Sequence, residues 1–429
     1  MHPEFLKNLP EGWNQLPMGD ACIFTGKPRT LDLADFPDVA FVPMDLIPSG
    51  DLSFSAFNMK DAASISSGTY FEEGDLLLSK ITPCFENGKQ GIAASIPNGF
   101  GFATTEVIPI KPRDGITHLP FVAFYLLHQE VRSLMAASME GATGRQRLPK
   151  DVLSGWPVPI PPMEEQRAIA GLLTDIQSAV RIQSAIARKT ADLKAATMTK
   201  LLREGLRGEP LKESDLGPIP ESWDVVRLGA IAKVGNGSTP SRTNEAYWQN
   251  GVFPWITSTK VHDVFIRAAD ELVSETALRE CHLPIVPKGS LVVAITGQGK
   301  TLGNAALLEM DTCVNQHLAY IRFLDERPFP EFFLFWLQNQ YQFFRDISSS
   351  GGSTKGALTC GFLGNLSVPV PSREEQKQIA GLLVELTKRQ HIAEKNAQVT
   401  KDLFTTALHQ LMTGTVRIGH LESAEVVNA

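Results

Sequence analysis

A short loop that combines glycine with arginine carries the clearest chemistry in this sequence. Residues 141–147 read Gly-Ala-Thr-Gly-Arg-Gln-Arg. Glycine lets a backbone approach another surface closely. An arginine fork fits O6 and N7 of guanine, and a glutamine amide fits N6 and N7 of adenine. Gly144, Arg145, Gln146 and Arg147 are therefore candidate DNA contacts, although a solvated surface turn would have the same composition.

A second candidate loop lies earlier in the same half of the chain. Residues 80–89 form an irregular polar stretch that begins and ends with lysine. Lys80 and Lys89 supply two positive charges, and the Asn87 amide both donates and accepts hydrogen bonds. With Thr82 of the same loop, these residues are further candidate contacts.

The segment Thr296 to Thr301, Thr-Gly-Gln-Gly-Lys-Thr, resembles part of a nucleotide phosphate loop. The complete pattern requires glycine where this chain has Ala294, and it leads into a helix rather than into Leu-Gly-Asn. We interpret the segment as a basic turn whose backbone amides face an external phosphate, with Gln298 and Lys300 as candidate contacts. The rival interpretation is an enzyme that hydrolyses nucleotides at this turn.

Glycine-rich loops also occur in the second half of the chain. One covers residues 235–242, and another, residues 351–356, stands 210 positions after the arginine loop. A loop that keeps its place and its glycines but changes its other side chains is typical of changed specificity. The candidate contacts in these loops are Thr239, Ser241, Arg242, Ser353, Thr354 and Lys355.

No pattern in the sequence favours catalysis by this chain alone. The nine histidines and five cysteines are scattered without metal-ligand spacing, and no serine–histidine–aspartate set can be inferred. No apolar run reaches the roughly 18 residues that span a bilayer. Widely spaced cysteines fit a reducing cytoplasm. We therefore expect a cytoplasmic protein that binds no metal or cofactor and no membrane.

The net charge of −7 argues against a simple polyanion-binding protein. Residues 1–156 carry 12 basic and 18 acidic side chains, and residues 209–366 carry 13 and 17. Residues 157–208 are mildly basic, with 8 and 5. Any contact with nucleic acid must therefore come from local clusters, or be shared with a more basic partner.

The elements that position these loops occur twice. Residues 10–13, Pro-Glu-Gly-Trp, return 210 positions later as residues 220–223, Pro-Glu-Ser-Trp. Glu-Glu-Gln at 164–166 returns at 374–376, and Ile-Ala-Gly-Leu-Leu follows both copies. The stretches between differ almost completely. A period this long indicates a duplicated domain with its helix, because solenoid repeats have periods of about 20 to 50 residues.

Each repeat ends in a long predicted helix. Met163 to Arg203 contains no proline, and apolar residues recur at alternating spacings of three and four in both copies. Ser372 with Glu375 predicts a capping box, and Gly205 and Gly414 predict helix ends. We expect the two apolar stripes to pair within the chain as an antiparallel coiled coil, with the heads at opposite ends. The alternatives are packing of each helix on its own head or against another chain.

The sequence therefore predicts an α+β protein, with two mixed α/β heads joined by two long helices in a pseudo-two-fold tandem repeat. Apolar runs that follow glycine predict equivalent buried strands at 76–78 and 291–293, and buried helices are expected at 121–127 and 332–337. The predicted division is a first head at 1–156, a helical segment at 157–208, a second head at 209–366, a second helical segment at 367–415 and a tail at 416–429.

With these motifs placed, the chain resembles the specificity (S) subunit of type I restriction–modification enzymes along nearly its whole length. The most specific likeness is the repeated Pro-x-Pro, Glu-Gln, Ile-Ala and Leu-Leu element that opens each long helix. Residues 74–89, Thr105-Glu106 and 144–147 are similar to one class of target recognition domain. Residues 239–242, Tyr247-Trp248, Pro254-Trp255 and Asn315-Gln316 are similar to another class, from which Lys260 departs because an acidic residue is expected there. The resemblance adds these candidate DNA contacts: Thr105, Trp255, Lys260, Asn315 and Gln316.

The resemblance implies that each recognition domain reads one half of a bipartite, asymmetric site in double-stranded DNA. The helices would fix the spacer and dock two modification (methyltransferase) subunits, which recruit restriction subunits. S-adenosylmethionine, ATP and Mg would then be bound by those partners and not by this chain. A coiled-coil adapter that never contacts DNA is the alternative. The candidate docking and spacer residues are Glu165, Gln166, Ile169, Leu173, Ile176, Glu375, Gln376, Ile379, Leu383 and Leu386.

Overall fold

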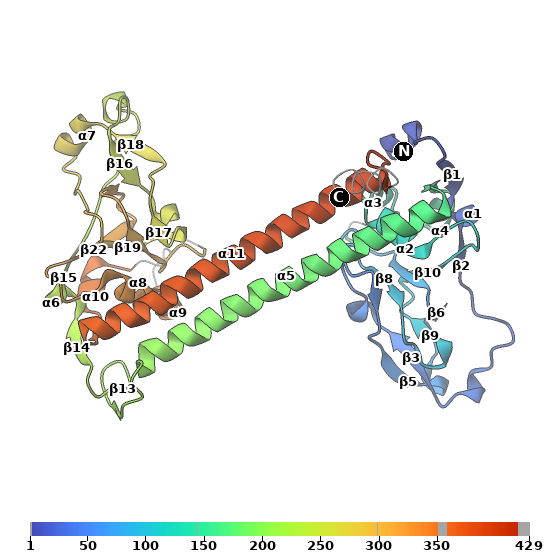
Figure 1. The fold of residues 1–429 in the computed structure, drawn as a ribbon, viewed down its shortest axis with the longest axis horizontal. Coiled ribbons are helices and arrows are strands. Elements are labelled where there is room, and N and C mark those ends of the chain that lie inside the picture. Colours follow the sequence, from blue (N-terminus) through green and yellow to red (C-terminus); the bar gives the residue numbers. More distant parts are fainter. Residues whose placement is uncertain (1, 143, 298, 351–357, 419–429) are drawn as a thin grey trace, which may run out of the picture. The chain divides into compact units, whose positions relative to one another are not determined.

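The computed structural model describes residues 2–142, 144–297, 299–350 and 358–418 (Figure 1). The chain forms two compact units, one made of Met1–Ala185 with Glu394–Ala429 and the other of Ile186–Ala393. Each unit therefore combines one head with the first part of one long helix and the last part of the other. The sequence repeat assigns one whole long helix to each copy. The compact units instead split each long helix near its middle, so that every unit contains half of both.

Among the described residues, the first unit contains three sheets and four short α-helices. The five-stranded sheet has the strand order β2-β10-β7-β8-β4, the four-stranded sheet has the order β5-β3-β9-β6, and β1 pairs with β11. The strands are β1 (Asn14–Pro17), β2 (Cys22–Phe24), β3 (Asp38–Val42), β4 (Ser53–Phe54), β5 (Asn58–Asp61), β6 (Thr69–Glu72), β7 (Leu76–Ser79), β8 (Gln90–Ala93), β9 (Phe100–Ala103), β10 (Val107–Pro112) and β11 (Pro157–Ile160). The short helices are α1 (Met18–Ala21), α2 (Leu119–Leu127), α3 (Gln129–Ala136) and α4 (Lys150–Ser154).

The second unit repeats this topology. Its five-stranded sheet has the order β15-β22-β19-β20-β17, and its smaller sheet has three strands in the order β18-β16-β21. Two further pairs are β14 with β23 and β12 with β13. The strands are β12 (Leu211–Lys212), β13 (Ile219–Pro220), β14 (Asp224–Arg227), β15 (Ala232–Asn236), β16 (Phe253–Ile256), β17 (Phe265–Ile266), β18 (Glu271–Val273), β19 (Leu291–Ala294), β20 (Ala305–Leu308), β21 (Cys313–Val314), β22 (Leu318–Phe323) and β23 (Ser367–Val370). The short helices are α6 (Leu228–Ile231), α7 (Glu275–Glu280), α8 (Pro330–Asn339), α9 (Tyr341–Ser350) and α10 (Cys360–Asn365).

The core of each head forms where the sequence predicts it. The side chains of the central strands β7 and β19 are buried along their whole length, as continuous apolar runs require. In α2 and α8 the predicted apolar segments are buried as well. The paired β strands and buried helices in both heads therefore confirm the predicted mixed α/β class.

Two long helices complete the fold, α5 (Met163–Glu204) and α11 (Arg373–Met412). The first agrees with the predicted span to within one residue. Gly205 and Gly414 follow these helices with φ of 67° and 68°, a left-handed conformation that glycine adopts without steric cost. The predicted helix ends are thus confirmed.

Each core receives the start of one long helix and the end of the other. Ile169 and Leu173 of α5 lie in the first core together with Leu411 of α11. Leu202 of α5 lies in the second core together with Ile379 of α11. The two helices therefore pass through each unit in opposite directions, as predicted.

Part of the middle of the predicted apolar stripe stays exposed. Ile186, Leu193 and Leu403 belong to the stripe and are exposed, whereas Ala393 of the second copy is buried. The heads and the helix ends cover its outer turns.

A buried glutamate fixes the start of each long helix. In the first unit, Glu165 accepts a hydrogen bond from Trp13 Nε1 at 3.1 Å, and Nε and Nη2 of Arg417 donate to its two oxygens at 2.6 and 2.7 Å. Trp13 directly precedes β1, and Arg417 follows α11. We call Trp13, Glu165 and Arg417 the first clamp.

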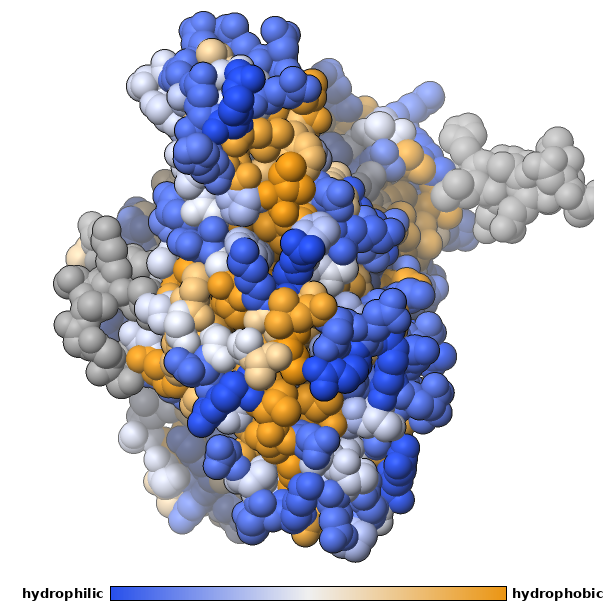
Figure 2. Space-filling model, turned by 90° about the vertical axis from the view of Figure 1, so that its left-hand side faces the viewer, coloured by the Kyte–Doolittle hydropathy of each residue, from blue (hydrophilic) through white to orange (hydrophobic). Residues whose placement is uncertain are grey.

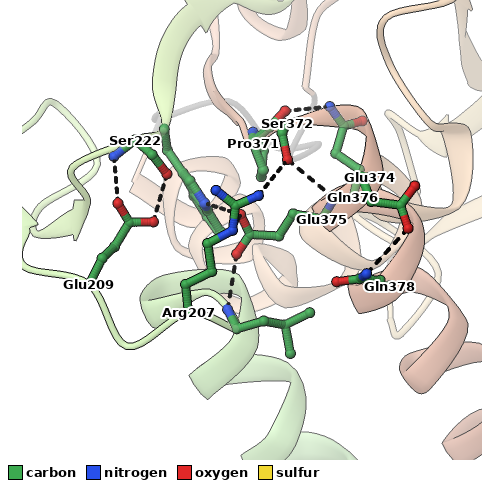
Figure 3. A network of polar contacts seen from close by, with 11 residues as sticks. Arg207, Glu209, Ser222, Pro371, Ser372, Glu374, Glu375, Gln376 and Gln378 are labelled. Carbon is green, nitrogen blue, oxygen red and sulfur yellow. Dashed lines mark hydrogen bonds and ion pairs between the residues drawn. The ribbon is translucent and has the colours of Figure 1, made fainter.

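The second clamp consists of the equivalent residues Trp223, Glu375 and Arg207, of which Figure 3 labels Glu375 and Arg207. Trp223 Nε1 donates to Glu375 Oε2 at 3.3 Å, and Arg207 Nε lies 3.6 Å from the same oxygen. Arg207 follows α5, so each helix start is clamped by an arginine that follows the other helix. All three members are related by the 210-residue offset.

The predicted capping box forms only in part. The backbone N–H of Glu375 donates to Ser372 Oγ at 3.3 Å, as such a box requires. The Glu375 carboxylate instead accepts from Trp223 and from the backbone N–H of Leu206 at 3.0 Å. Tertiary pairing therefore outweighs local capping for this side chain.

The face shown in Figure 2 lies on the side of the second unit and carries an interrupted band of apolar surface. Scattered exposed apolar side chains are common on folded proteins. The exposed large apolar residues of this unit's head and linker include Leu211, Val252, Leu272, Ile285 and Leu324.

A histidine pair joins the end of α11 to the first head. His128 Nε2 lies 3.0 Å from His409 Nδ1, and the two rings are stacked with centroids 5.2 Å apart. His128 is buried. Burial, together with the neighbouring His409, lowers the pKa of His128 to about 4. The docked end of α11 therefore requires a neutral imidazole at position 128.

We expect Arg417→Ala to destabilise the first unit by about 1–3 kcal/mol, because Glu165 would remain largely buried without its cation. Urea unfolding followed by tryptophan fluorescence measures this change. Arg389→Ala is the matched control, since Arg389 forms an exposed pair with Glu385 on α11 and its loss should cost less than about 1 kcal/mol. Equal effects of both substitutions would contradict the clamp.

We expect the first unit to lose stability as the pH falls from about 6.5 to about 4. In this window the unfolded state binds a proton at His128 and the folded state does not, so the contribution is complete above the unfolded pKa and declines below it. The total is on the order of 3 kcal/mol. His128→Gln should flatten the pH dependence of urea unfolding, whereas His391→Gln, at an exposed position on α11, should leave it unchanged.

Candidate nucleic-acid interface

Three loops of the first head meet beside the ends of β7 and β10. The backbone N–H of Lys80 donates to the Glu106 carbonyl at 2.9 Å, and that of Leu148 donates to the Lys80 carbonyl at 2.8 Å. The backbone N–H of Thr82 donates to the Gln146 carbonyl at 3.0 Å. We call residues 80–82, 105–106 and 145–148 the first junction, and it brings together most of the predicted contacts of this head.

An arginine held by a glutamate projects from the first junction. Arg147 Nε and Nη2 donate to the two carboxylate oxygens of Glu106 at 2.8 and 2.7 Å, while 44% of the arginine side chain stays exposed. Hydrogen bonds from Arg147 lower the pKa of Glu106, and the charges of Lys80 and Arg145 act in the same direction. The pair is therefore fully ionised at neutral pH, inside a locally basic surface.

A cavity of about 490 Å³ opens beside this arginine. Charged side chains dominate its polar lining, with Lys80, Arg147 and Lys150 opposed by Glu140. Thr105 and Arg145 are exposed, Gly144 has a φ of 80°, and Gln146 is half-buried. Half of the residues that line the cavity are apolar, so this surface offers cationic and hydrogen-bonding groups beside an apolar wall.

Two predicted contacts of the first head have partners within the head. Lys89 is half-buried and its Nζ donates to the Met44 carbonyl at 2.7 Å, so one of its three N–H groups is used there, and its role as a DNA contact stays a prediction. Thr82 Oγ1 donates to Glu86 at 2.8 Å, and Asn87 is exposed. Burial of a lysine against a backbone carbonyl depends on the neighbouring segment, which the local sequence does not reveal.

The second head repeats the same backbone framework. The N–H of Ile295 donates to the His317 carbonyl at 2.9 Å, and that of Leu358 donates to the Ile295 carbonyl at 2.7 Å. We call residues 295–297, 315–317 and Leu358 the second junction.

A hydrogen-bonded set of polar side chains occupies the second junction. Gln316 Oε1 accepts from Thr239 Oγ1 at 2.5 Å, and Gln316 Nε2 lies 3.2 Å from His317 Nε2. His317 Nδ1 is hydrogen-bonded to Thr296 Oγ1. Gln316 is exposed, and Thr239, Thr296 and His317 are half-buried. Predicted contacts Thr239 and Gln316 therefore lie together.

Arg242 forms a separate exposed site in the second head. Its guanidinium lies 3.9 Å from the centroid of the Trp248 ring, and Nη2 donates to Glu271 Oε1 at 3.0 Å. The hydrogen bond with Glu271 raises the pKa of Arg242. Ser241 next to it is exposed. Arg242 is thus fixed and accessible, as a contact residue should be.

Three predicted contacts drawn from the family motif of the second head have partners within the head. Trp255 is 1% exposed, and Asn315 is buried with its side-chain oxygen accepting from the His317 backbone N–H at 3.1 Å. Lys260 is half-buried and pairs with Asp263 and Asp270 at 3.0 and 3.1 Å, and hydrogen bonds to both raise its pKa. Trp255 and Asn315 therefore build the core of this head, whereas Lys260 forms an ion pair at its surface.

The turn that resembles a phosphate loop leads into strand β20 and not into a helix. Lys300 is exposed, and its carbonyl accepts from Asn304 Nδ2 and from Tyr341 Oη at 2.6 and 3.0 Å. The turn therefore lacks the helix that a nucleotide-hydrolysing phosphate loop requires. The other predicted contacts of these loops, Gln298, Ser353, Thr354 and Lys355, lie outside the described residues.

Most candidate docking residues are turned into the heads. Gln166 Oε1 accepts from the His118 backbone N–H at 2.8 Å, and Gln376 Oε1 accepts from that of Phe329 at 2.7 Å. These two side chains pack helix against head, which fits the spacer part of the predicted docking and spacer set. The buried members of this set are Gln166, Ile169, Leu173, Glu375, Gln376, Ile379 and Leu383, Glu165 is largely covered, and Ile176 and Leu386 are half-buried.

Sequence reasoning missed the arginines of the two clamps and the side chains of Glu106, His317 and Thr296 as site residues. The 210-residue offset relates Arg207 to Arg417 and is the signal that was available for the clamps. In the described ranges, no cluster of three His, Cys, Asp or Glu side chains is arranged to hold a metal ion. No helix among those residues has the length and apolar character needed to cross a membrane.

Comparison with known proteins identifies the framework. The family model for the type I restriction modification DNA specificity domain matches twice, at residues 10–189 and 220–401. The type I restriction enzyme EcoEI specificity subunit of Escherichia coli is 30% identical over 169 residues, which is 39% of this chain and 28% of that protein. The MjaVIII specificity subunit of Methanocaldococcus jannaschii is 25% identical over 331 residues, covering 75% of this chain and 76% of that protein.

Solved structures show the same fold. The S subunit of a type I restriction–modification system from M. genitalium has a TM-score of 0.58 at 16% sequence identity, and the match covers 96% of this chain and 99% of that one. The two family matches coincide with the two repeats and cover well over half of the sequence. This chain therefore belongs to the type I restriction modification DNA specificity domain family.

Proposed function

We propose that this chain is the DNA sequence-specificity subunit of a type I restriction–modification complex, in which each head reads one half of a bipartite, asymmetric site. One observation carries the proposal. Two heads with equivalent five-stranded sheets keep the same junction backbone, yet they hold an ion pair in one case and hydrogen-bonded polar groups in the other. Membership in the DNA specificity domain family supports it.

Covalent linkage of unlike heads explains why the site would be asymmetric. A homodimer with two-fold symmetry reads two identical half-sites, because its reading surfaces are identical. A single chain with two diverged heads reads two different half-sites. The long helices would then set the spacer between them.

The charge balance fits a subunit that works with partners. Neutralisation of DNA phosphates gives affinity and makes it depend on salt, and a chain with a net charge of −7 contributes little of this. Two modification subunits would supply basic surface and the pocket for a flipped adenine. S-adenosylmethionine, ATP and Mg would be bound by the modification and restriction subunits, and this chain would not be catalytic by itself.

Exposed apolar residues on the long helices offer a docking stripe for the modification subunits. Ile182 and Ile392 are equivalent in the repeat and are 55% and 58% exposed. Leu172 with Leu382 and Leu193 with Leu403 are further equivalent exposed pairs. Each unit presents three of these six side chains, so two copies of one partner would find the same surface twice.

We expect methylome sequencing of the host to reveal one bipartite adenine-methylation motif that disappears when the gene for this chain is deleted and returns with its expression. The motif should have two dissimilar half-sites. The modification gene must stay intact in the deletion strain, so that loss of the motif can be assigned to this chain. A methylome that does not change on deletion would contradict the proposal. If the chain were instead an adapter that never contacts DNA, it would show no salt-dependent binding to duplex DNA.

We expect Ile182→Asp with Ile392→Asp to weaken binding of the modification subunits by about 2 kcal/mol per site, because each buried isoleucine contributes about that much. Titration of purified subunits followed by analytical ultracentrifugation measures this. Val252→Asp is the matched control, since Val252 is an exposed apolar residue of the second head. Unchanged assembly of the double variant would exclude this stripe as the docking surface.

A further inference from the structure

The two junctions share a backbone and differ in their side chains. In the first head, the residue after β7 donates its N–H to the residue before β10, and its carbonyl accepts from a leucine N–H. In the second head, the residue after β19 makes the same two bonds, to the residue before β22 and to a leucine. Lys80 thus corresponds to Ile295, Glu106 to His317 and Leu148 to Leu358. Because the framework bonds are backbone bonds, the side chains at these positions can change without loss of the framework.

The first junction presents part of a guanidinium in a fixed orientation. Glu106 occupies the edge of Arg147 formed by Nε and Nη2. In the part of the chain that the structure describes, Nη1 of Arg147 has no hydrogen-bond partner. Three of the five N–H groups of arginine therefore remain for a ligand, and two of them form the end-on fork that fits O6 and N7 of guanine.

The carboxylate restricts where this fork points. A long side chain such as arginine loses rotamer entropy when it is immobilised on binding. Glu106 holds Arg147 in one orientation before any ligand arrives. Glu106 is therefore a positioning residue for Arg147, and its ordinary contribution to stability as an exposed pair is small.

The second junction presents different chemistry at the same place. Gln316, His317 and Thr296 form a chain of hydrogen-bonding groups with Thr239 at one end. An exposed glutamine amide that is oriented on one side by a threonine and on the other by an imidazole suits the N6 and N7 edge of adenine. The group that Glu106 contributes to the first head is thus replaced by an imidazole in the second.

We propose that base specificity is set at this equivalent junction in both heads, with Arg147 oriented by Glu106 to read guanine in one half-site and Gln316 oriented by His317 to read adenine in the other. The proposal rests on the proposed function and adds the reading residues. Glu106 and His317 act by positioning their neighbours.

The test measures base preference in each half-site separately. The full complex of this chain with its modification subunits is purified with wild-type chain, Arg147→Lys, Glu106→Gln, Gln316→Glu or His317→Gln, and each is used to select from a library randomised in both half-sites. We expect Arg147→Lys and Glu106→Gln to reduce the preference for one guanine about tenfold or more, with the other half-site unchanged. Gln316→Glu and His317→Gln should relax one position of the other half-site only.

A matched control separates reading from general electrostatics. Arg267→Lys alters an exposed arginine paired with Glu309, at the opposite end of β20 from the second junction, and should change no base preference. A variant that weakens all sequences equally would be a phosphate contact or a folding defect and would overturn the inference for that residue. Thermal denaturation of each variant identifies the folding defects, and Glu106→Gln tests the first head if Arg147→Lys does not fold.

The failure of the inference can be told from that of the proposed function. A wild-type complex that selects no bipartite motif removes the proposed function. A wild-type complex that selects a motif, together with junction variants that select the same motif at every position, removes the inference alone.

Discussion

A carboxylate buried at the start of each long helix is the constraint on which the rest of this structure depends. Glu375 is 1% exposed, and a buried carboxylate without partners would cost several kcal/mol. Its partners come from both repeats, the indole of Trp223 from its own and the guanidinium of Arg207 from the other. In the first clamp, Glu165 is likewise bound by Trp13 of its own repeat and by Arg417 of the other. Neither helix start can be satisfied within its own repeat, so the chain must bring the end of each long helix to the start of the other.

This exchange separates the scaffold from the reading surface. The clamps, with Gln166 and Gln376 bonded to the backbone of the heads, fix each helix to its head through side chains that lie in the repeated element. The junction loops contribute none of these bonds. A head can therefore change Arg147 or Gln316 without disturbing the helices, which is the physical condition for two different specificities on one framework.

The sequence predicted what depends on periodicity and on duplication, and it failed where a side chain's role depends on tertiary neighbours. Helix spans, central strands and the opposite directions of the helices follow from apolar spacing and from the 210-residue offset. Trp255 and Asn315 have types that suit nucleic acids, yet their burial is decided by strands far along the chain. The resemblance implies a docking and spacer role for the Glu-Gln element, and the local sequence does not show that its side chains are covered. Its burial follows from partners such as Arg417 that lie up to 252 residues away.

The same pairing of arginine with glutamate has different consequences at the clamp and at the junction, and exposure decides between them. Glu165 is largely covered, so its bond to Arg417 compensates for a desolvated charge and is structural. Glu106 and Arg147 are partly exposed, and a pair in that setting contributes at most about 1 kcal/mol. Stability alone is therefore a weak reason for a bidentate pair on a loop. Orientation is a stronger one, because a guanidinium fixed along one edge presents its remaining donors in a single plane, and hydrogen-bond recognition of a base edge requires that plane.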